Sequence, residues 1–221
     1  MSKVNVNTIE PSTGTDITLG ASGDTITVPS GATFTQSGTM NASAITAGTL
    51  AVARGGTGTT SYSPGITEVD LWYVTSSFTE TGMDVVTANW SRFPSSLGFN
   101  HMGTGMSQSS GIFTFPSTGL WNITWHFIAY HDTDANYVGG HIYTTEDDFS
   151  SEIGAAQAYT NTRGGASSST VGIYVSTIFD CEATATHKVK FYTEAQAATE
   201  FVGSSTIGRM TASFTRLGDT P

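Results

Sequence analysis

Side chains that carry oxygen or nitrogen gather in one short stretch of the chain, which is the first candidate for chemistry. The stretch consists of His131, Asp132, Asp134, Asn136 and Tyr137. The alternating oxygens of Asp132, Asp134 and Asn136 match the start of a calcium loop, but an EF-hand needs Gly where Tyr137 stands and Glu where Tyr143 stands. A surface turn capped by its own Asx side chains is the alternative. Calcium is therefore the only cofactor that the sequence suggests.

The same stretch is also the first candidate for contact with a binding partner. Imidazole, carboxylate, amide and phenol groups can all form hydrogen bonds with sugar hydroxyls. Loops on a rigid scaffold commonly carry the binding residues of a protein. We therefore expect His131, Asp132, Asp134, Asn136 and Tyr137 to contact a receptor.

No other group of side chains forms a catalytic pattern. The acidic run at 146–148 is expected to be a solvated loop. The alternative is a glycosidase pair, which needs two carboxylates at a set separation and a pocket that raises the pKa of one of them. His126, His131 and His141 are five and ten residues apart, which does not match a zinc site, and we expect them to face solvent or an interface. A Gly-x-Ser-x-Gly elbow is absent, so the sequence predicts no catalytic residue.

Charge and composition exclude several classes of partner. The chain has 18 Asp and Glu against 8 Lys and Arg, a net charge of −10, so it should repel phosphate backbones and anionic lipids. No apolar stretch is long enough to span a bilayer, and the N-terminus lacks the apolar run of a signal peptide. Cys181 is the single cysteine, and we expect it to be buried. We expect a protein made in the cytoplasm that binds no nucleic acid and inserts into no membrane.

The composition of the chain changes near Tyr62. Only five charged residues and one aromatic residue, Phe34, precede Tyr62, whereas all four Trp and all five His residues follow it. A segment with so few large apolar side chains cannot bury enough surface to fold alone. We therefore divide the chain into an attachment segment (1–15), a repetitive shaft (16–62), a linker (63–70) and a head (71–221).

The shaft contains a short repeat with the period of a β-strand. Three-residue runs at 17–19, 26–28 and 34–36 each place a Thr between two outer residues, and turn-rich pieces separate the runs. The outer residues share one face of each run, and the expected core residues are Ile17, Leu19, Ile26, Val28 and Phe34. One chain makes only a thin apolar stripe, whereas three chains around one axis close every strand edge. The repeat predicts an intertwined trimeric β-shaft, and a flexible linker is the alternative.

A glycine-rich motif completes the shaft. Its sequence, Ile-Thr-Ala-Gly-Thr-Leu at 45–50 and Ala-Arg-Gly-Gly-Thr-Gly at 53–58, resembles a module of bacteriophage tail fibres. Glycines allow positive φ and close approach of backbones, and an arginine can reach carbonyl groups across an interface. We therefore expect an interface between chains, formed by Arg54, Gly55, Gly56 and Gly58.

The head has the pattern of many short strands. Large apolar residues alternate with polar ones from Trp121 to Phe127, which predicts a strand with one buried face. Further strand-like runs lie at 71–74, 111–115, 137–143, 171–179, 188–192 and 209–214. Because no helical stretch interrupts them, the sequence predicts an all-β head with a jelly-roll β-sandwich.

Two motifs give the head a family resemblance. The segment Gly-Ile-Phe-Thr-Phe-Pro at 111–116, followed by Gly-Leu-Trp at 119–121, resembles a pattern of the complement globular head, part of the tumour-necrosis-factor-like superfamily. The segment 204–214 resembles the closing strand of that family, from which Ile207 and Arg209 depart. The resemblance implies a ten-stranded jelly roll that trimerises around an apolar axis, binds ligands through exposed loops and sometimes holds calcium.

These features together predict a structural and adhesive protein of a bacteriophage virion. In this hypothesis the chain is a homotrimeric fibre or spike, the N-terminus docks on other virion proteins, and the head meets a glycan or protein of the host cell surface. One alternative is a purely structural neck, head or capsid decoration fibre. A more distant alternative is a polysaccharide depolymerase.

Overall fold

The computed structural model describes residues 9, 11, 13–15, 21–25, 27–33 and 35, and then 65–131, 135–162 and 169–221. It divides the chain into two compact units, Met1–Tyr62 and Ser63–Pro221. The second unit is called the head below.

The first unit shows two of the turns that separate the predicted β runs. Asp24 N donates to Ala21 O and Ala32 N donates to Pro29 O, each over 3.0 Å. Val28 is 47% exposed in the single chain. The other expected core and interface residues lie outside the described residues; they are Ile17, Leu19, Ile26, Phe34, Arg54, Gly55, Gly56 and Gly58.

The described part of the head consists of β-strands and one short 3-10 helix, η3 (Ser95–Leu97). The strands are β1 (Val69–Val74), β2 (Phe78–Val85), β3 (Trp90–Arg92), β4 (His101–Met102), β5 (Ser107–Ser109), β6 (Ile112–Thr114), β7 (Gly119–His131), β8 (Ala135–Thr145), β9 (Ile153–Thr162), β10 (Ser169–Cys181), β11 (Lys188–Phe201) and β12 (Thr211–Gly218). All their pairings are antiparallel, and the all-β prediction is confirmed for the head.

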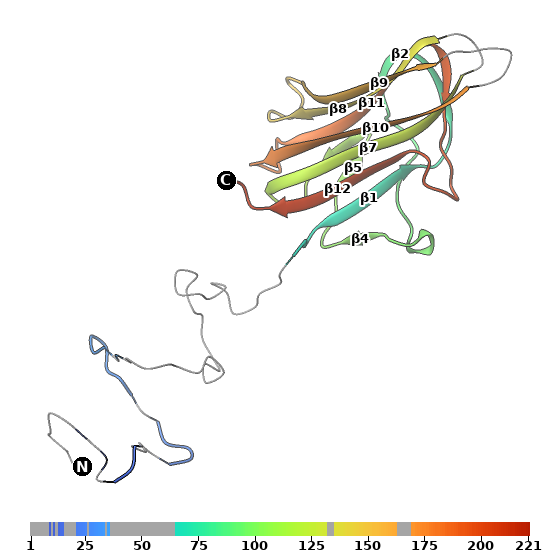
Figure 1. Cartoon of the computed structure of the whole chain (residues 1–221). Coiled ribbons are helices and arrows are strands. Elements are labelled where there is room, and N and C mark those ends of the chain that lie inside the picture. The colour runs from blue at the N-terminus through green and yellow to red at the C-terminus, as the bar shows by residue number, and fades with distance from the viewer. Residues whose placement is uncertain are drawn as a thin grey trace. The chain divides into compact units, whose positions relative to one another are not determined.

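The strands form two layers that share one core (Figure 1). The first sheet contains β3, β1, β12, β7 and β10 in that order, with the short β4 also paired to β1. The second contains β2, β11, β8 and β9, with β6 also paired to β11 and β5 to β6. The two sheets meet where β11 pairs with the end of β7, with Glu200 opposite Tyr130. This arrangement is consistent with a jelly-roll sandwich.

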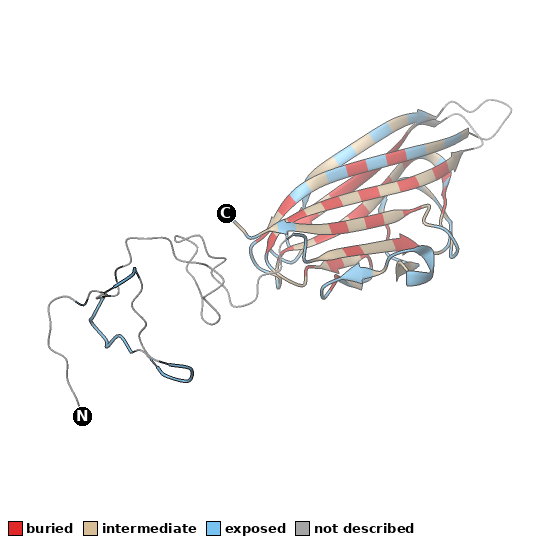
Figure 2. Cartoon of the chain, turned by 60° about the horizontal axis from the view of Figure 1, so that its bottom comes forward, coloured by how far each residue is buried: buried red, intermediate tan, exposed pale blue. Residues whose placement is uncertain are grey.

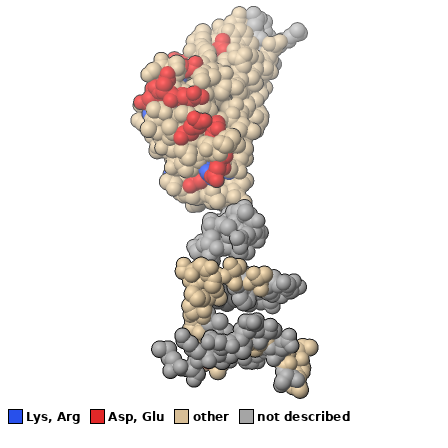
Figure 3. Space-filling model, turned by 90° about the vertical axis from the view of Figure 1, so that its left-hand side faces the viewer, with Lys and Arg blue, Asp and Glu red and all other residues tan. Residues whose placement is uncertain are grey.

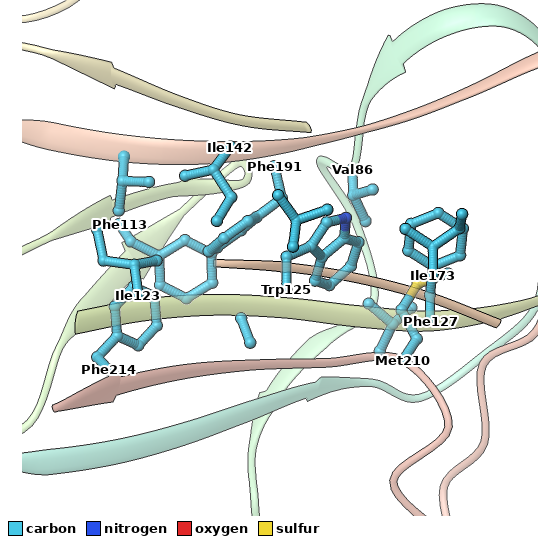
Figure 4. Packing of buried hydrophobic residues seen from close by; sticks show 14 of the residues in the cluster. Val86, Phe113, Ile123, Trp125, Phe127, Ile142, Ile173, Phe191, Met210 and Phe214 are labelled. Atoms are coloured by element: carbon cyan, nitrogen blue, oxygen red, sulfur yellow. The ribbon is translucent and has the colours of Figure 1, made fainter. Parts of the chain in front are cut away.

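Strand β7 supplies the centre of the core. Trp121, Ile123, Trp125 and Phe127 are each at most 1% exposed, and the residues between them are only partly buried, as the stripes of Figure 2 show. Phe191 of β11 stacks on Trp125 with ring centroids 5.0 Å apart, and Figure 4 shows these side chains filling the space between the sheets. The predicted alternation is confirmed, because each sheet turns one apolar face toward the other.

Strands β2 and β9 were not predicted from the sequence. The alanines of β9 have low β propensity, yet Ala156 and Ala158 pack against the core. The pairing of β9 with β8 thus determines its conformation more than its composition does. Cys181 is buried, as expected, and burial raises the pKa of its thiol to about 11.

A buried carboxylate fixes the connection between β3 and β5. Asp70 is 1% exposed and accepts hydrogen bonds from Trp72 Nε1 and Met106 N at 2.8 and 2.7 Å. Arg92 donates to both carboxylate oxygens of Asp70, from Nε to Oδ1 and from Nη2 to Oδ2, each over 3.0 Å. Every donor around Asp70 thus comes from a different strand or loop, and the carboxylate ties them together.

Candidate functional site

The outward face of the second sheet carries a cluster of phenols, an imidazole and a carboxylate. Alternation along β8 turns Val138 and Ile142 into the core and leaves Tyr137, His141 and Tyr143 on the other face. The register places other members of the cluster beside them: Glu194 of β11 and Tyr159 of β9 both lie opposite Gly139. We call Tyr137, His141, Tyr159 and Glu194 the Glu194 cluster.

Gly139 allows the two neighbouring side chains to meet across β8. A Cβ atom at this position would lie 2.5 Å from Cε1 of Tyr159, which no side chain tolerates. Because Gly139 leaves that space open, the Tyr159 hydroxyl reaches Glu194 Oε2 at 2.8 Å.

Glu194 accepts three hydrogen bonds at once. Tyr137 donates to Oε1 at 3.1 Å, while Tyr159 and His141 Nε2 contact Oε2 at 2.8 and 2.9 Å. The hydrogen bond to Glu194 raises the pKa of Tyr137. Burial raises the pKa of Tyr159 to about 12, and its hydrogen bond to Glu194 adds to this effect. Both phenols therefore stay protonated near neutral pH and donate to the carboxylate.

His141 lies beneath the surrounding rings. It is 2% exposed, and the Tyr159 ring meets it edge-on with centroids 5.3 Å apart. Its Nδ1 atom has no hydrogen-bond partner among the described residues. The expectation that His141 faces solvent or an interface is therefore wrong, because the neighbouring tyrosines cover it. His126, on the outward face of β7, is partly buried, and burial lowers its pKa.

A second group of side chains continues the same face. The Tyr143 and Tyr192 rings are 4.8 Å apart, and the Tyr192 hydroxyl donates to Glu152 Oε2 at 2.8 Å. Lys190 pairs with Glu152 and lies 4.3 Å above the Phe149 ring centroid. The face thus carries an aromatic and carboxylate surface that reaches from β9 to β11.

The acidic run at 146–148 forms the exposed turn between β8 and β9, as predicted. Figure 3 shows acidic side chains gathered on this end of the head. Asp147 accepts from the Ser151 hydroxyl and backbone N and from the Thr145 hydroxyl, and these bonds lower its pKa to about 2. Asp148 pairs with Lys188. A general acid needs the opposite shift, so Asp147 does not fit the general-acid role of a glycosidase pair.

The expected receptor loop is described only in part. Asp132 and Asp134 lie outside the described residues, and His131 and Asn136 are described only as backbone of β7 and β8. Tyr137 is the one of the five candidates whose side chain is described, and its hydroxyl donates to Glu194. Among the described residues, no group of three or more His, Cys, Asp or Glu could hold a metal ion.

Most of the Glu194 cluster was missed from the sequence. The signal within β8 was its period-two spacing, Tyr137-x-Gly139-x-His141-x-Tyr143, which places these residues on one face. Nothing local to β8 indicated that Glu194 and Tyr159 would complete the cluster, since Tyr159 arrives through pairing with the next strand, β9, and Glu194 through pairing with the more distant β11. In the part of the chain that is described, no helix is long and apolar enough to cross a membrane.

Comparison with known proteins shows a fold and no closer relationship. No family model and no curated protein matches the chain. Eiger TNF from S. frugiperda is similar in structure, with a TM-score of 0.54 and 10% sequence identity over 69% of this chain and 94% of that one. Murine APRIL at pH 5.0 has a TM-score of 0.50 and 12% identity over 68% of this chain and 98% of that one. The head therefore has the jelly-roll fold of tumour-necrosis-factor-like proteins, which confirms that part of the predicted resemblance.

Proposed function

We propose that this chain is a fibre protein of a bacteriophage virion, a homotrimer whose head binds a glycan or protein of the host cell surface. The observation that carries the proposal is the order of its parts. A head with a tumour-necrosis-factor-like jelly roll follows a Gly-, Ser- and Thr-rich segment that contains the fibre-like motif at 41–60. The N-terminal segment attaches to other virion proteins, and the protein acts by binding without catalysis.

The outward face of the first sheet supports the homotrimer. Tyr174 and Ile178 of β10 are 61% and 63% exposed, and Tyr174 lies opposite His126 of β7. Large apolar side chains exposed on the same open sheet face favour burial by another surface. A second and third copy of the head bury them, and association of identical chains in a closed ring pairs every copy of the assembly surface.

The remaining sheet face supports the binding role. The Glu194 cluster lies on the outward face of the second sheet, away from Tyr174 and Ile178 on the first. A trimer built through the first sheet leaves this second face open to a partner. The head therefore has one face for assembly and another for recognition.

Localisation in the particle tests the proposal. Antibodies against the head should label purified virions released from cells that carry this gene, and added full-length protein should compete with the virions for adsorption. Labelling at the tail tip together with competition supports recognition. Labelling at the neck or capsid without competition supports the decoration alternative, and absence of the chain from virions contradicts both. Release of reducing ends from host polysaccharide would support the depolymerase instead.

A further inference from the structure

We infer that the outward face of the second sheet, centred on the Glu194 cluster, is a binding site for uncharged saccharides. The inference gives a ligand class to the receptor function proposed above and rests on that proposal for its biological meaning. The site itself rests on three observations: the direction of its hydrogen bonds, its exposed ring and its local charge.

The hydrogen bonds on this face all run toward carboxylates. Tyr137 and Tyr159 donate to Glu194, and Tyr192 donates to Glu152. A phenol has one proton to donate and two lone pairs, so each of these oxygens can only accept a further hydrogen bond. Glu194 uses three of its roughly four acceptor positions. The face consequently offers many acceptors, and the ligand that suits it is rich in O–H donors.

An exposed aromatic ring lies in the middle of these acceptors. Tyr159 is 47% exposed, while its hydroxyl is held by Glu194 and its ring packs on His141 and Tyr137 with centroids 5.3 and 5.5 Å apart. The ring is thus fixed before a ligand arrives, which lowers the entropic cost of binding. Gln157, exposed on the same strand opposite His141, adds an amide that both donates and accepts. A rigid ring flanked by acceptors fits the C–H face and hydroxyl edge of a pyranose.

The charge of the Glu194 cluster favours an uncharged sugar over the other ligands that tyrosines bind. The uncompensated charge of the cluster is the carboxylate of Glu194, because Glu152 is paired with Lys190, so a phosphate or an acidic sugar is repelled. A cation is attracted to rings and carboxylates, but Glu194 already accepts three hydrogen bonds and is 16% exposed. Little of its charge remains available for direct contact with an ammonium group, so the hydroxyl-rich ligand is favoured.

The test measures binding of defined probes to the full-length protein by saturation-transfer NMR and calorimetry. The probes are neutral oligosaccharides of glucose, galactose and N-acetylglucosamine, a sialylated oligosaccharide, choline and a lysine-rich peptide. We expect at least one neutral oligosaccharide to bind, and the sialylated probe and both cationic probes to bind more weakly or not at all. Binding of choline or the peptide in preference to every sugar, or binding of no probe, would overturn the inference.

Matched variants locate the site. Tyr159→Ala removes the ring and should weaken binding by about tenfold, as loss of one aromatic contact implies. Tyr159→Phe keeps the ring and removes the hydroxyl, so it should retain most of the affinity. Ile207→Ala, at a residue that is 54% exposed outside the strands, is the control and should bind as the wild type does. Unchanged affinity of Tyr159→Ala, with its thermal unfolding transition intact, places the sugar elsewhere.

The virion experiment distinguishes failure of this site from failure of the proposed function. If the wild-type chain competes for phage adsorption and Tyr159→Ala competes equally well, the fibre function stands and the site is wrong. If the chain binds a neutral sugar through Tyr159 but is absent from virions, the site stands and the fibre function is wrong.

Discussion

At the scale of single residues, Asp70 is a buried carboxylate that accepts hydrogen bonds from three other residues of the head. Replacing it by Ala leaves Trp72 Nε1 and Met106 N without their acceptor and leaves Arg92 with its bond to Met106 O. Because Arg92 is 30% exposed and can be solvated, the loss should be smaller than for a fully buried pair, and we expect about 1.5–3 kcal/mol in urea unfolding of Asp70→Ala.

The control for this variant is Asp219→Ala, which removes the ion-pair partner of Arg216. Asp219 is 92% exposed, so its replacement should change the free energy of unfolding by less than about 1 kcal/mol. Equal losses for the two variants would show that the Asp70 contacts do not stabilise the head.

His126 should make the head less stable as the pH falls from 7 to 5. Burial lowers its pKa below the value of 6.5 in the unfolded chain, so the unfolded chain binds the proton more tightly. The free energy of unfolding is unaffected by His126 well above pH 6.5 and falls as the pH drops through that value. Asp147, whose pKa is lowered to about 2, stabilises the head in a separate pH range. This stabilisation is lost as the pH falls from about 4 to about 2.

Thermal unfolding of His126→Gln at pH 7 and pH 5 measures the effect. The melting temperature of this variant should fall less between pH 7 and pH 5 than that of the wild type. The melting temperature of His101→Gln, at an exposed position on β4, should fall as much as that of the wild type. A decline in His126→Gln as steep as in the wild type would assign the pH dependence to other groups.

Calcium binding by Asp132, Asp134 and Asn136 remains a prediction from the sequence. A metal that binds only the folded head raises its stability by mass action, by about 2.7 kcal/mol at a hundred times the dissociation constant. We therefore expect the melting temperature to rise with added calcium and to fall with a chelator. An unchanged melting temperature in both conditions would eliminate calcium as a cofactor.

At the scale of elements, the meeting of β8, β9 and β11 depends on Gly139. A Cβ at this position overlaps the Tyr159 ring, so Gly139→Ala should push the ring aside, break its bond to Glu194 and destabilise the head by about 1–3 kcal/mol. Gly172→Ala on β10 is the matched control, because the nearest atom, Phe127 O, lies 4.0 Å from the new Cβ. Urea unfolding should show a loss of stability only for Gly139→Ala. Equal losses of stability in the two variants would contradict the role of Gly139 where β8, β9 and β11 meet.

How far the sequence predicts each element depends on what determines its conformation. Trp121, Trp125 and Phe127 alternate with polar residues and predict β7 correctly, because a half-buried strand imposes that pattern. The small alanines of β9 carry no such pattern and are held by pairing with β8. The candidate site could likewise be predicted only in part. Tyr137 can be identified within its own segment, but Glu194 lies beside it only because of the register between β8 and β11.

At the scale of the whole molecule, assembly decides which surfaces meet a partner. The first sheet exposes Tyr174 and Ile178 on its outward face, and the second exposes Tyr159 on the opposite side of the sandwich. In the proposed trimer, three copies joined through the first sheet bury Tyr174 and Ile178 and repeat the Tyr159 surface three times. Repetition raises the apparent affinity for a surface that carries many sugars, since later contacts form within one complex.

The proposed fibre depends most on the association of three chains, and the mass of the full-length protein in solution tests this directly. Light scattering after gel filtration should give three times the 23.2 kDa of one chain, about 70 kDa for a closed cyclic trimer. The mass should not rise further when the protein is concentrated, because a closed ring has no free end to which further chains can add. A monodisperse particle with the mass of a single chain would contradict the trimer and, with it, the proposed fibre.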